Sequence, residues 1–210
     1  MEIPSLFPQL EVEHSTWIGS RLEVHARASQ VCHTCPDCGT KSCKVHSFYL
    51  RSPRDLPVSD HPVRLRLRVR RFFCFNSACP RATFSETFPE LLSPKAQRTR
   101  RLKSAQGQVG VAVGGQAGAR LLQKLHMATS PDTTLRTMAA LPLPTRPSPR
   151  VVGIDDFAFR KGVNYGTVLV NLERRHIVDV LLDRSVTTVA TWLKKHPGIE
   201  QALGTVRSSR

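Results

Sequence analysis

The sequence VRLRLRVR at residues 63–70 alternates apolar and arginine side chains without a break. Side chains of a β-strand point alternately to its two faces, so this period of two predicts a strand with one apolar and one basic face. The basic face would carry Arg64, Arg66, Arg68 and Arg70, spaced about 6.6 Å apart, which suits contacts with successive phosphates. The alternative is a solvent-facing strand whose charges prevent edge pairing.

Cysteine pairs flank this strand. The motif CPDCG at residues 35–39 precedes it, and Cys74 and Cys79 follow it. Two residues between cysteines let both thiolates face one ion, and the glycine allows the backbone to turn. Cys74 and Cys79 have four residues between them. Two cysteine pairs separated by a β segment are typical of a structural zinc site. We therefore predict that Cys35, Cys38, Cys74 and Cys79 bind Zn²⁺, which would supply most of the folding energy of so small a segment.

The sequence leaves the choice of zinc ligands open. Cys32 forms a second CxxC spacing with Cys35, and other potential ligands nearby are His33, Cys43 and His46. The alternative is six thiols that bind no metal. The amino terminus lacks the basic and apolar regions of a secretory signal, so we expect reduced thiols or metal ligands rather than disulfides.

Basic charge is concentrated in the middle of the chain. The 210 residues contain 31 Lys and Arg against 16 Asp and Glu, and residues 51–150 hold 18 of the basic and 5 of the acidic side chains. Such a concentration indicates a surface that binds a polyanion such as nucleic acid, because each neutralised phosphate releases counterions. The alternative is a solvated basic face without a partner. No apolar run is long enough for a transmembrane helix.

Three helices are expected between the cysteine segment and a proline-rich stretch. Ser93-Pro94 would cap the first helix, which Gly114-Gly115 ends. A second helix is expected at residues 116–125, and a third begins at the cap Ser130-Pro131-Asp132 after a short turn. A helix, a turn of about four residues and a capped helix make up the helix-turn-helix arrangement.

The third helix of such an arrangement would enter the major groove of DNA. Its residues expected to be exposed, and to contact bases or phosphates, are Thr133, Thr134, Arg136 and Thr137. Basic side chains near the start of the first helix oppose its dipole, which indicates a ligand and makes Arg98 and Arg101 candidate DNA contacts. The alternative is a helical hairpin that binds nothing.

The last part of the chain is β-rich. Strands are expected at residues 150–156, 165–171 and 176–182 as an antiparallel meander, followed by a helix that Ser185 or Thr187 caps. Asp155 and Asp156 end the first strand, where nuclease-type folds hold Mg²⁺. A turn or cap role for these acids is the alternative, because one acid is not a metal site.

Together these segments predict an α+β multidomain chain. The expected divisions are a β-rich zinc-binding domain at residues 1–90, a helix-turn-helix DNA-binding domain at residues 91–141, a proline-rich linker at residues 142–149 and a third domain at residues 150–210.

The order of these motifs resembles the insertion-sequence transposases of the ISL3 family. The motifs that carry the resemblance are CPDCG at 35–39, RDLP at 54–57, VRLRLRVRRFFC at 63–74, TFSE at 83–86, GGQAGARLL at 114–122, SPDTTLR at 130–136 and GIDDFAFRKG at 153–162. The resemblance implies a zinc-binding domain, a helix-turn-helix and a ribonuclease-H-like α/β domain. In that family three acids and divalent metal, here expected to be Mg²⁺, cut and join DNA at the terminal inverted repeats. Asp155 matches the first catalytic acid, and Asp156 is less suited to bind the metal.

The final residues depart from the family pattern. Residues 201–210 contain no acid and are not expected to form the family's next strand, so we expect an incomplete ribonuclease-H-like domain with one of three metal acids. The chain is then a C-terminally truncated transposase that binds double-stranded DNA without transposing alone, in the cytoplasm and with the nucleoid. The alternatives are a stand-alone regulator of intact transposase, or an enzyme completed by a second reading frame. Intact transposase or a second copy of the chain is a further expected partner.

Overall fold

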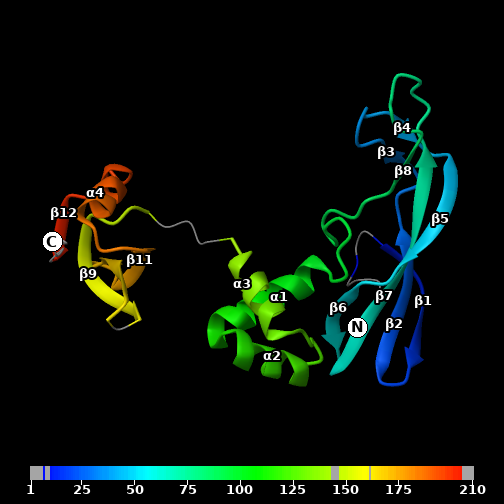
Figure 1. The fold of residues 1–210 in the computed structure, drawn as a ribbon. Coiled ribbons are helices and arrows are strands. Elements are labelled where there is room, and N and C mark those ends of the chain that lie inside the picture. The colour runs from blue at the N-terminus through cyan, green and yellow to red at the C-terminus, as the bar shows by residue number, and fades with distance from the viewer. Residues whose placement is uncertain (1–6, 8–9, 143–146, 161, 205–210) are drawn as a thin grey trace. The chain divides into compact units, whose positions relative to one another are not determined.

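A computed structural model describes residues 7, 10–142, 147–160 and 162–204 of the chain. The chain divides into two compact units, Met1–Pro142 and Leu143–Arg210, which are described separately (Figure 1). Residues 143–146 of the expected proline-rich linker lie outside the described residues. Within the part of the chain that the structure describes, no helix has the length and apolar character needed to cross a bilayer.

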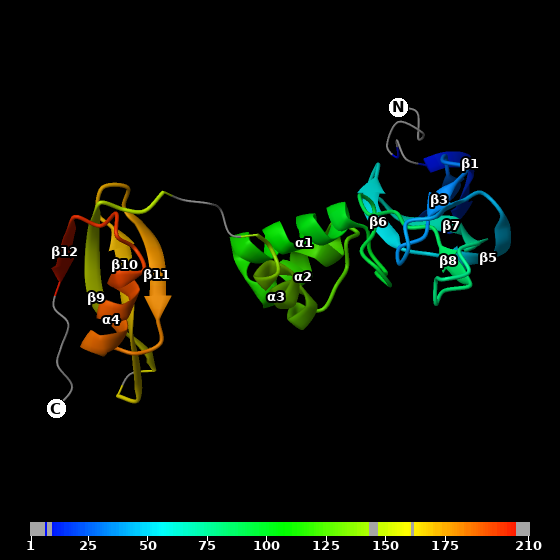
Figure 2. The ribbon, with the colours of Figure 1, turned by 90° about the horizontal axis from the view of Figure 1, so that it is seen from above.

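The first unit contains a sheet organised around one long strand, β7 (Figures 1 and 2). The order is β1-β2-β7-β5, and β6 and β8 pair with other parts of β7. Only β2 and β7 run parallel among these pairs of described strands. The strands are β1 (Leu10–Ile18), β2 (Arg21–Ala28), β5 (Val45–Arg51), β6 (Arg54–Val58), β7 (His61–Phe73) and β8 (Thr83–Ser85), and a separate hairpin is formed by β3 (His33–Thr34) and β4 (Lys41–Ser42).

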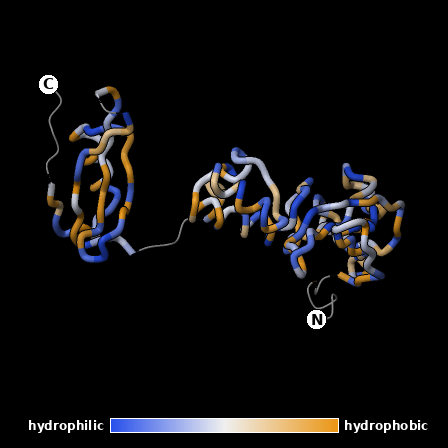
Figure 3. Tube along the Cα trace, turned by 90° about the horizontal axis from the view of Figure 1, so that it is seen from below, coloured by the Kyte–Doolittle hydropathy of each residue, from blue (hydrophilic) through white to orange (hydrophobic). Residues whose placement is uncertain are grey.

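The predicted alternation along β7 is confirmed. Val63, Leu65, Leu67 and Val69 are at most 4% exposed, and they pack with apolar residues of β2 and of residues 88–92. Full burial of each such side chain stabilises the fold by about 1.5–3 kcal/mol. The apolar side chains of β7 therefore lie on one face of the sheet, and its arginines at residues 64–70 lie on the other. Hydrophobic and hydrophilic positions are interspersed along the trace of this unit (Figure 3).

Three helices, α1 (Arg100–Val113), α2 (Gly115–Lys124) and α3 (Pro131–Ala139), follow the sheet. The expected start of the first helix at Ser93 is wrong, because Thr99 is the N-cap and its Oγ1 accepts from the Leu102 N–H. Residues 97–99 instead run beside β6, where the Arg54 N–H donates to Gln97 O at 2.9 Å. The expected cap of α3 is confirmed, since Ser130 Oγ accepts from the Thr133 N–H.

Glycines let the three helices approach closely. A Cβ added at Gly110 of α1 would lie 3.0 Å from Thr134 Cγ2, and one added at Gly118 of α2 would lie 3.2 Å from the same atom. Thr134 of α3 is therefore enclosed between two helices, with no exposed surface. This crossing holds the orientation of α3 against α1 and α2.

A buried carboxylate joins the helices to the sheet. Asp55 of β6 is 2% exposed, and it accepts from Thr99 Oγ1 at 2.6 Å and from Arg101 Nε at 2.8 Å. Because Thr99 is also the N-cap, the start of α1 is fixed to β6. The helices and the sheet thus belong to one packed unit.

The second unit is a four-stranded sheet covered on one face by a helix. Its order is β11-β10-β9-β12, and β9, β10 and β11 form the expected antiparallel meander. The core is formed by β9, β10 and α4, which contribute Val152, Ile154, Leu169, Val189 and Trp192. The elements are β9 (Val151–Arg160), β10 (Asn164–Asn171), β11 (His176–Leu181), α4 (Val186–Lys194) and β12 (Gln201–Gly204).

The expectation that residues 201–210 form no further strand is wrong for their first part. Gln201–Gly204 forms β12, which pairs in parallel with β9. The connection through α4 makes this possible, because a parallel pair requires a crossover that returns the chain to the same edge of the sheet. Residues 205–210 lie outside the described residues.

Replacing Asp55 tests the junction between the sheet and the helices. We expect Asp55→Ala to lower the free energy of unfolding by about 2–3 kcal/mol, measured by urea denaturation, because Arg101 and Thr99 lose a buried partner. This is below the loss for a fully buried pair, since the Arg101 side chain is 36% exposed. Glu90→Ala, which removes an exposed carboxylate, is the control. Equal stability of the two variants would contradict the junction.

Candidate metal centre and nucleic-acid interface

The four predicted zinc ligands converge in the first unit. The sulfur atoms of Cys35, Cys38, Cys74 and Cys79 all lie within 4.8 Å of one another. Cys35 Sγ is 3.9 Å from Cys79 Sγ, and Cys38 Sγ is 3.6 Å from Cys74 Sγ. Zinc–sulfur bonds of about 2.3 Å in a tetrahedron require sulfur atoms about 3.8 Å apart. The chemistry and spacing of these sulfurs therefore fit a structural Zn²⁺ ion.

Two short turns present the four sulfurs. In the first, the Gly39 N–H donates to Cys35 O at 3.0 Å, and Gly39 has a φ of 73°, which glycine adopts readily. In the second, the Cys79 N–H donates to Asn76 O at 3.0 Å. Phe72 and Phe84 pack behind Cys35, so the cluster lies at the end of β7.

The thiols do not ionise independently. Cys38 Sγ lies 3.3 Å from Thr40 Oγ1, and hydrogen bonding with the side chain and then the backbone of Thr40 lowers the pKa of Cys38 to about 6. Although the Asn76 backbone favours the Cys74 thiolate, burial and the neighbouring sulfurs outweigh it and raise the pKa of Cys74 to about 12. Four adjacent thiolates need a cation to neutralise them, which a divalent metal supplies.

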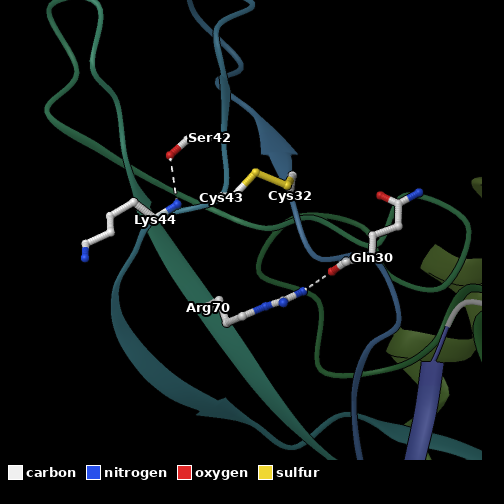
Figure 4. The surroundings of a disulfide bond; sticks show 6 residues. All are labelled: Gln30, Cys32, Ser42, Cys43, Lys44 and Arg70. Carbon is white, nitrogen blue, oxygen red and sulfur yellow. Dashed lines mark hydrogen bonds between the residues drawn. A yellow bond between two sulfur atoms is a disulfide. The ribbon is translucent and has the colours of Figure 1, made fainter.

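The remaining two cysteines form a disulfide. Cys32 and Cys43 are bonded across the β3–β4 hairpin, which contradicts the expectation that no disulfide forms (Figure 4). Their neighbour Cys35 points to the metal cluster instead, so the alternative Cys32–Cys35 ligand pair does not occur. The two histidines considered as ligands have other contacts: His33 Nε2 lies 3.3 Å from a Glu86 carboxylate oxygen, and His46 Nδ1 lies 2.9 Å from Ser47 Oγ.

Glutamates neutralise much of the predicted arginine row. Arg70 forms an ion pair of 2.7 Å with the buried carboxylate of Glu86, and its guanidinium also donates to Gln30 O (Figure 4). Arg66 lies 3.5 Å from Glu23 of β2. Arg66 also donates from Nη1 to Ser52 Oγ at 3.0 Å, while its buried Nε has no hydrogen-bond partner. Arg66 and Arg70 thus both make contacts within the first unit.

The other two arginines of β7 differ from each other. Arg68 lies 3.7 Å from Glu13 and covers the ring of Phe48. Arg64 forms no ion pair within the part of the chain that the structure describes, and its buried Nε has no hydrogen-bond partner. The row is therefore not a uniform basic surface. Arg64 differs from the other three arginines because it has no carboxylate partner among the described residues.

The two candidate arginines before and in α1 also have partners. Arg101 pairs with Asp55 and covers the ring of Phe7, which accounts for its charge at a helix start without any ligand. Arg98 donates to Gln106 Oε1, and Gln106 Nε2 donates in turn to Met127 O at 2.8 Å. Arg98 thus supports the turn before α3.

The expected exposure of two threonines on α3 is wrong. Thr134 is enclosed at the glycine crossing and Thr137 is 2% exposed, so neither contacts a ligand from its present position. Arg136 is exposed, and Thr133 is half-buried and accepts from Arg136 at 3.1 Å. The free face of α3 also presents Leu135, which is 45% exposed.

Sequence reasoning missed one basic residue. Arg54 of β6 is exposed and donates to Ala128 O, in the turn before α3, at 2.8 Å. Arg54 belongs to the RDLP motif, one residue before the buried Asp55, and this motif is the signal from which it could have been predicted.

The candidate catalytic acid lies in the second unit. Asp155 is exposed on β9, opposite Val168 of β10. Ile154 and Leu169 face α4, so Asp155 points to the other face of the sheet. Within the described residues, the four cysteines are the only group of three or more His, Cys, Asp or Glu that is arranged to hold a metal.

Known proteins match the chain in two places. Residues 32–79 match the zinc finger of the transposases IS204, IS1001, IS1096 and IS1165, and residues 152–206 match a transposase domain model of the ISL3 group. Over these two parts the chain is similar to the ISL3 family of transposases. A transposase for insertion sequence element IS1001 from Bordetella parapertussis is 27% identical over 180 residues, which cover 85% of this chain and 43% of that protein. No solved structure matches.

One ISL3 match falls on each of the two units. The zinc-finger match includes all four clustered cysteines, and the transposase match includes Asp155. The latter also reaches past β12, so residues 201–206 do resemble the family, contrary to expectation.

Removing one zinc ligand should unfold the cysteine segment. We expect Cys38→Ser to lose bound zinc, measured by metal analysis of the purified protein, and to lose structure, because a structural zinc site contributes on the order of 10 kcal/mol. The matched control is the double variant Cys32→Ser/Cys43→Ser, which we expect to keep one zinc per chain. A folded, zinc-free Cys38→Ser protein would show that the cluster is not structural.

Proposed function

We propose that the first unit binds double-stranded DNA at the terminal inverted repeats of an insertion sequence, with α3 in the major groove. The observation that carries this proposal is the helix pair α2–α3, in which Ser130 caps α3 and Thr134 anchors it while Arg136 and Leu135 face solvent. The similarity to transposases supports DNA as the nucleic acid. Arg136 would contact base edges or phosphates, and Thr133 would hold its guanidinium.

The zinc centre has a structural part in this proposal. The cysteine cluster lies at one end of β7, and the other half of the same strand pairs with β6, which carries Arg54 and Asp55. Zinc therefore stabilises the sheet on which the helices rest. Loss of zinc would weaken DNA binding through the fold, since none of the four sulfurs has to contact DNA.

The second unit would be part of a ribonuclease-H-like nuclease domain. Support comes from the sheet order β11-β10-β9-β12, the parallel return of β12 beside β9, and the transposase match over these residues. Asp155 would be one ligand of Mg²⁺, which prefers carboxylate oxygens and activates water for phosphodiester cleavage. Among the described residues Asp155 belongs to no group of three or more potential metal ligands, so we propose that these 210 residues do not catalyse strand transfer by themselves.

A regulatory role is a second candidate. It is favoured by the compactness of the first unit, which holds the zinc centre and all three helices of the DNA-binding region. A chain that occupies the terminal repeats would exclude intact transposase from them, and it would be found with the nucleoid. Repression of transposition in cells that also express an intact transposase would distinguish this role from a remnant without effect.

DNA binding can be tested at α3. We expect Arg136→Ala to weaken binding to a terminal-repeat duplex about 5- to 150-fold, measured by fluorescence anisotropy, because a bidentate arginine contact to a base contributes about 1–3 kcal/mol. The control is Arg174→Ala, which removes an exposed arginine in the turn between β10 and β11. Equal weakening in both variants would indicate non-specific charge effects and contradict the role of α3.

Catalysis can be tested with the same duplex. We expect the purified 210-residue polypeptide with Mg²⁺ to give no strand-transfer product above background in a gel assay, while it still shifts the duplex. Asp155→Asn should bind DNA as the parent does. Robust Mg²⁺-dependent strand transfer would overturn the proposal that these residues lack a complete metal site.

A further inference from the structure

Three arginines lie side by side across three neighbouring stretches of backbone. Arg64 of β7 is paired directly with Arg54 of the antiparallel strand β6. Arg54 is in turn bridged to Arg98 in the extended segment before α1, where the Thr99 N–H donates to Arg54 O at 2.9 Å. Side chains of directly paired residues point to the same face, and neighbouring strands are about 4.8 Å apart. The three guanidinium groups therefore start from adjacent positions on one face.

Two of these three arginines are connected to the turn that precedes α3. Arg54 donates to Ala128 O, and Arg98 is linked through Gln106 to Met127 O, so both reach the turn that precedes the Ser130 cap. Arg136 points from α3 toward the same end of the helix, because its Nη2 donates to Thr133 Oγ1. Four arginines thus extend from the sheet to the N-terminal end of α3.

Like charges at this spacing repel one another. Burial is the larger cause that lowers the pKa of Arg98, and the positive charges of Arg54 and Arg136 lower it further. None of the four arginines forms an ion pair with a carboxylate within the described residues. By contrast, Arg66, Arg68 and Arg70 of the same sheet each have a glutamate partner.

We propose that Arg64, Arg54, Arg98 and Arg136 form a binding row for the phosphodiester backbone of the duplex whose major groove receives α3. The planar guanidinium fork matches a phosphate, and a polyanion with regularly spaced charges neutralises several arginines at once. A backbone strand that follows the row passes from β7 over β6 to the start of α3. The row sets the position of the duplex, and the exposed face of α3 reads it.

This inference rests on the proposed DNA binding and adds the sheet to the interface. It explains why β6 touches the turn before α3, since a contact from β6 to a phosphate is useful only if β6 and α3 keep a fixed geometry. It also separates the arginines of β7 into one ligand-binding residue, Arg64, and three that stabilise the sheet.

Arg64 offers the cleanest test, because its guanidinium makes no hydrogen bond or ion pair among the described residues, and its removal relieves repulsion with Arg54. We expect Arg64→Gln to keep or raise the melting temperature and to reduce affinity for a terminal-repeat duplex. The slope of log K against log salt concentration should fall by about 0.9 for each phosphate that the variant no longer neutralises. Arg64→Lys should keep most of the slope, because the charge remains.

The matched control is Arg68→Gln on the same strand, which breaks the contact with Glu13 and should leave the salt slope unchanged. Zinc content and circular dichroism check that both variants are folded. If the parent binds DNA and Arg64→Gln has the parent's slope, the row is wrong while the proposed function stands. If the parent does not bind the duplex at low salt, the proposed function fails as well.

Discussion

The buried carboxylate of Asp55 is the contact on which the architecture of the first unit depends. It accepts hydrogen bonds from the hydroxyl of Thr99, which is the N-cap of α1, and from the guanidinium of Arg101 in the first turn of that helix. The helices therefore cannot rotate against the sheet without exposing or abandoning a buried charge. One residue earlier, Arg54 reaches the turn before α3. The RDLP motif thus sets both the start of the bundle and the entry to its last helix.

Ion pairing within the sheet decides which basic residues remain for a ligand. Arg66 contacts a glutamate of β2, Arg68 contacts one of β1, and Arg70 contacts one that follows β8. An arginine that already has a buried partner, as Arg70 has in Glu86, gains little from a phosphate, because the existing pair has to be broken first. Arg54, Arg64 and Arg98 have no carboxylate partner within the described residues. The net charge of the chain is therefore a poor guide to its interface, and the pairing pattern is a better one.

The sequence predicts some features well because they depend on local spacing. The period of two along β7, the cap at Ser130 and the CxxC turn are read directly from neighbouring residues, and the structure reproduces each of them. Other features depend on contacts between distant residues. The sequence alone predicts that Thr134 is exposed on its helix, but Gly110 and Gly118 of two other helices enclose it. The sequence alone also predicts a cap at Ser93, but residues 97–99 pair with β6 and the helix begins later. The Cys32–Cys43 disulfide and the strand Gln201–Gly204 likewise depend on which segments meet in the fold.

The central claim is that sheet and helices form one DNA-binding surface along a row of arginines without carboxylate partners. The most direct measurement is an NMR titration of the arginine Nε–Hε signals with a terminal-repeat duplex. The account predicts that the signals of Arg54, Arg64, Arg98 and Arg136 shift, and that those of Arg66, Arg68 and Arg70 stay in place. Shifts confined to the glutamate-paired arginines, or spread evenly over all of them, would contradict it.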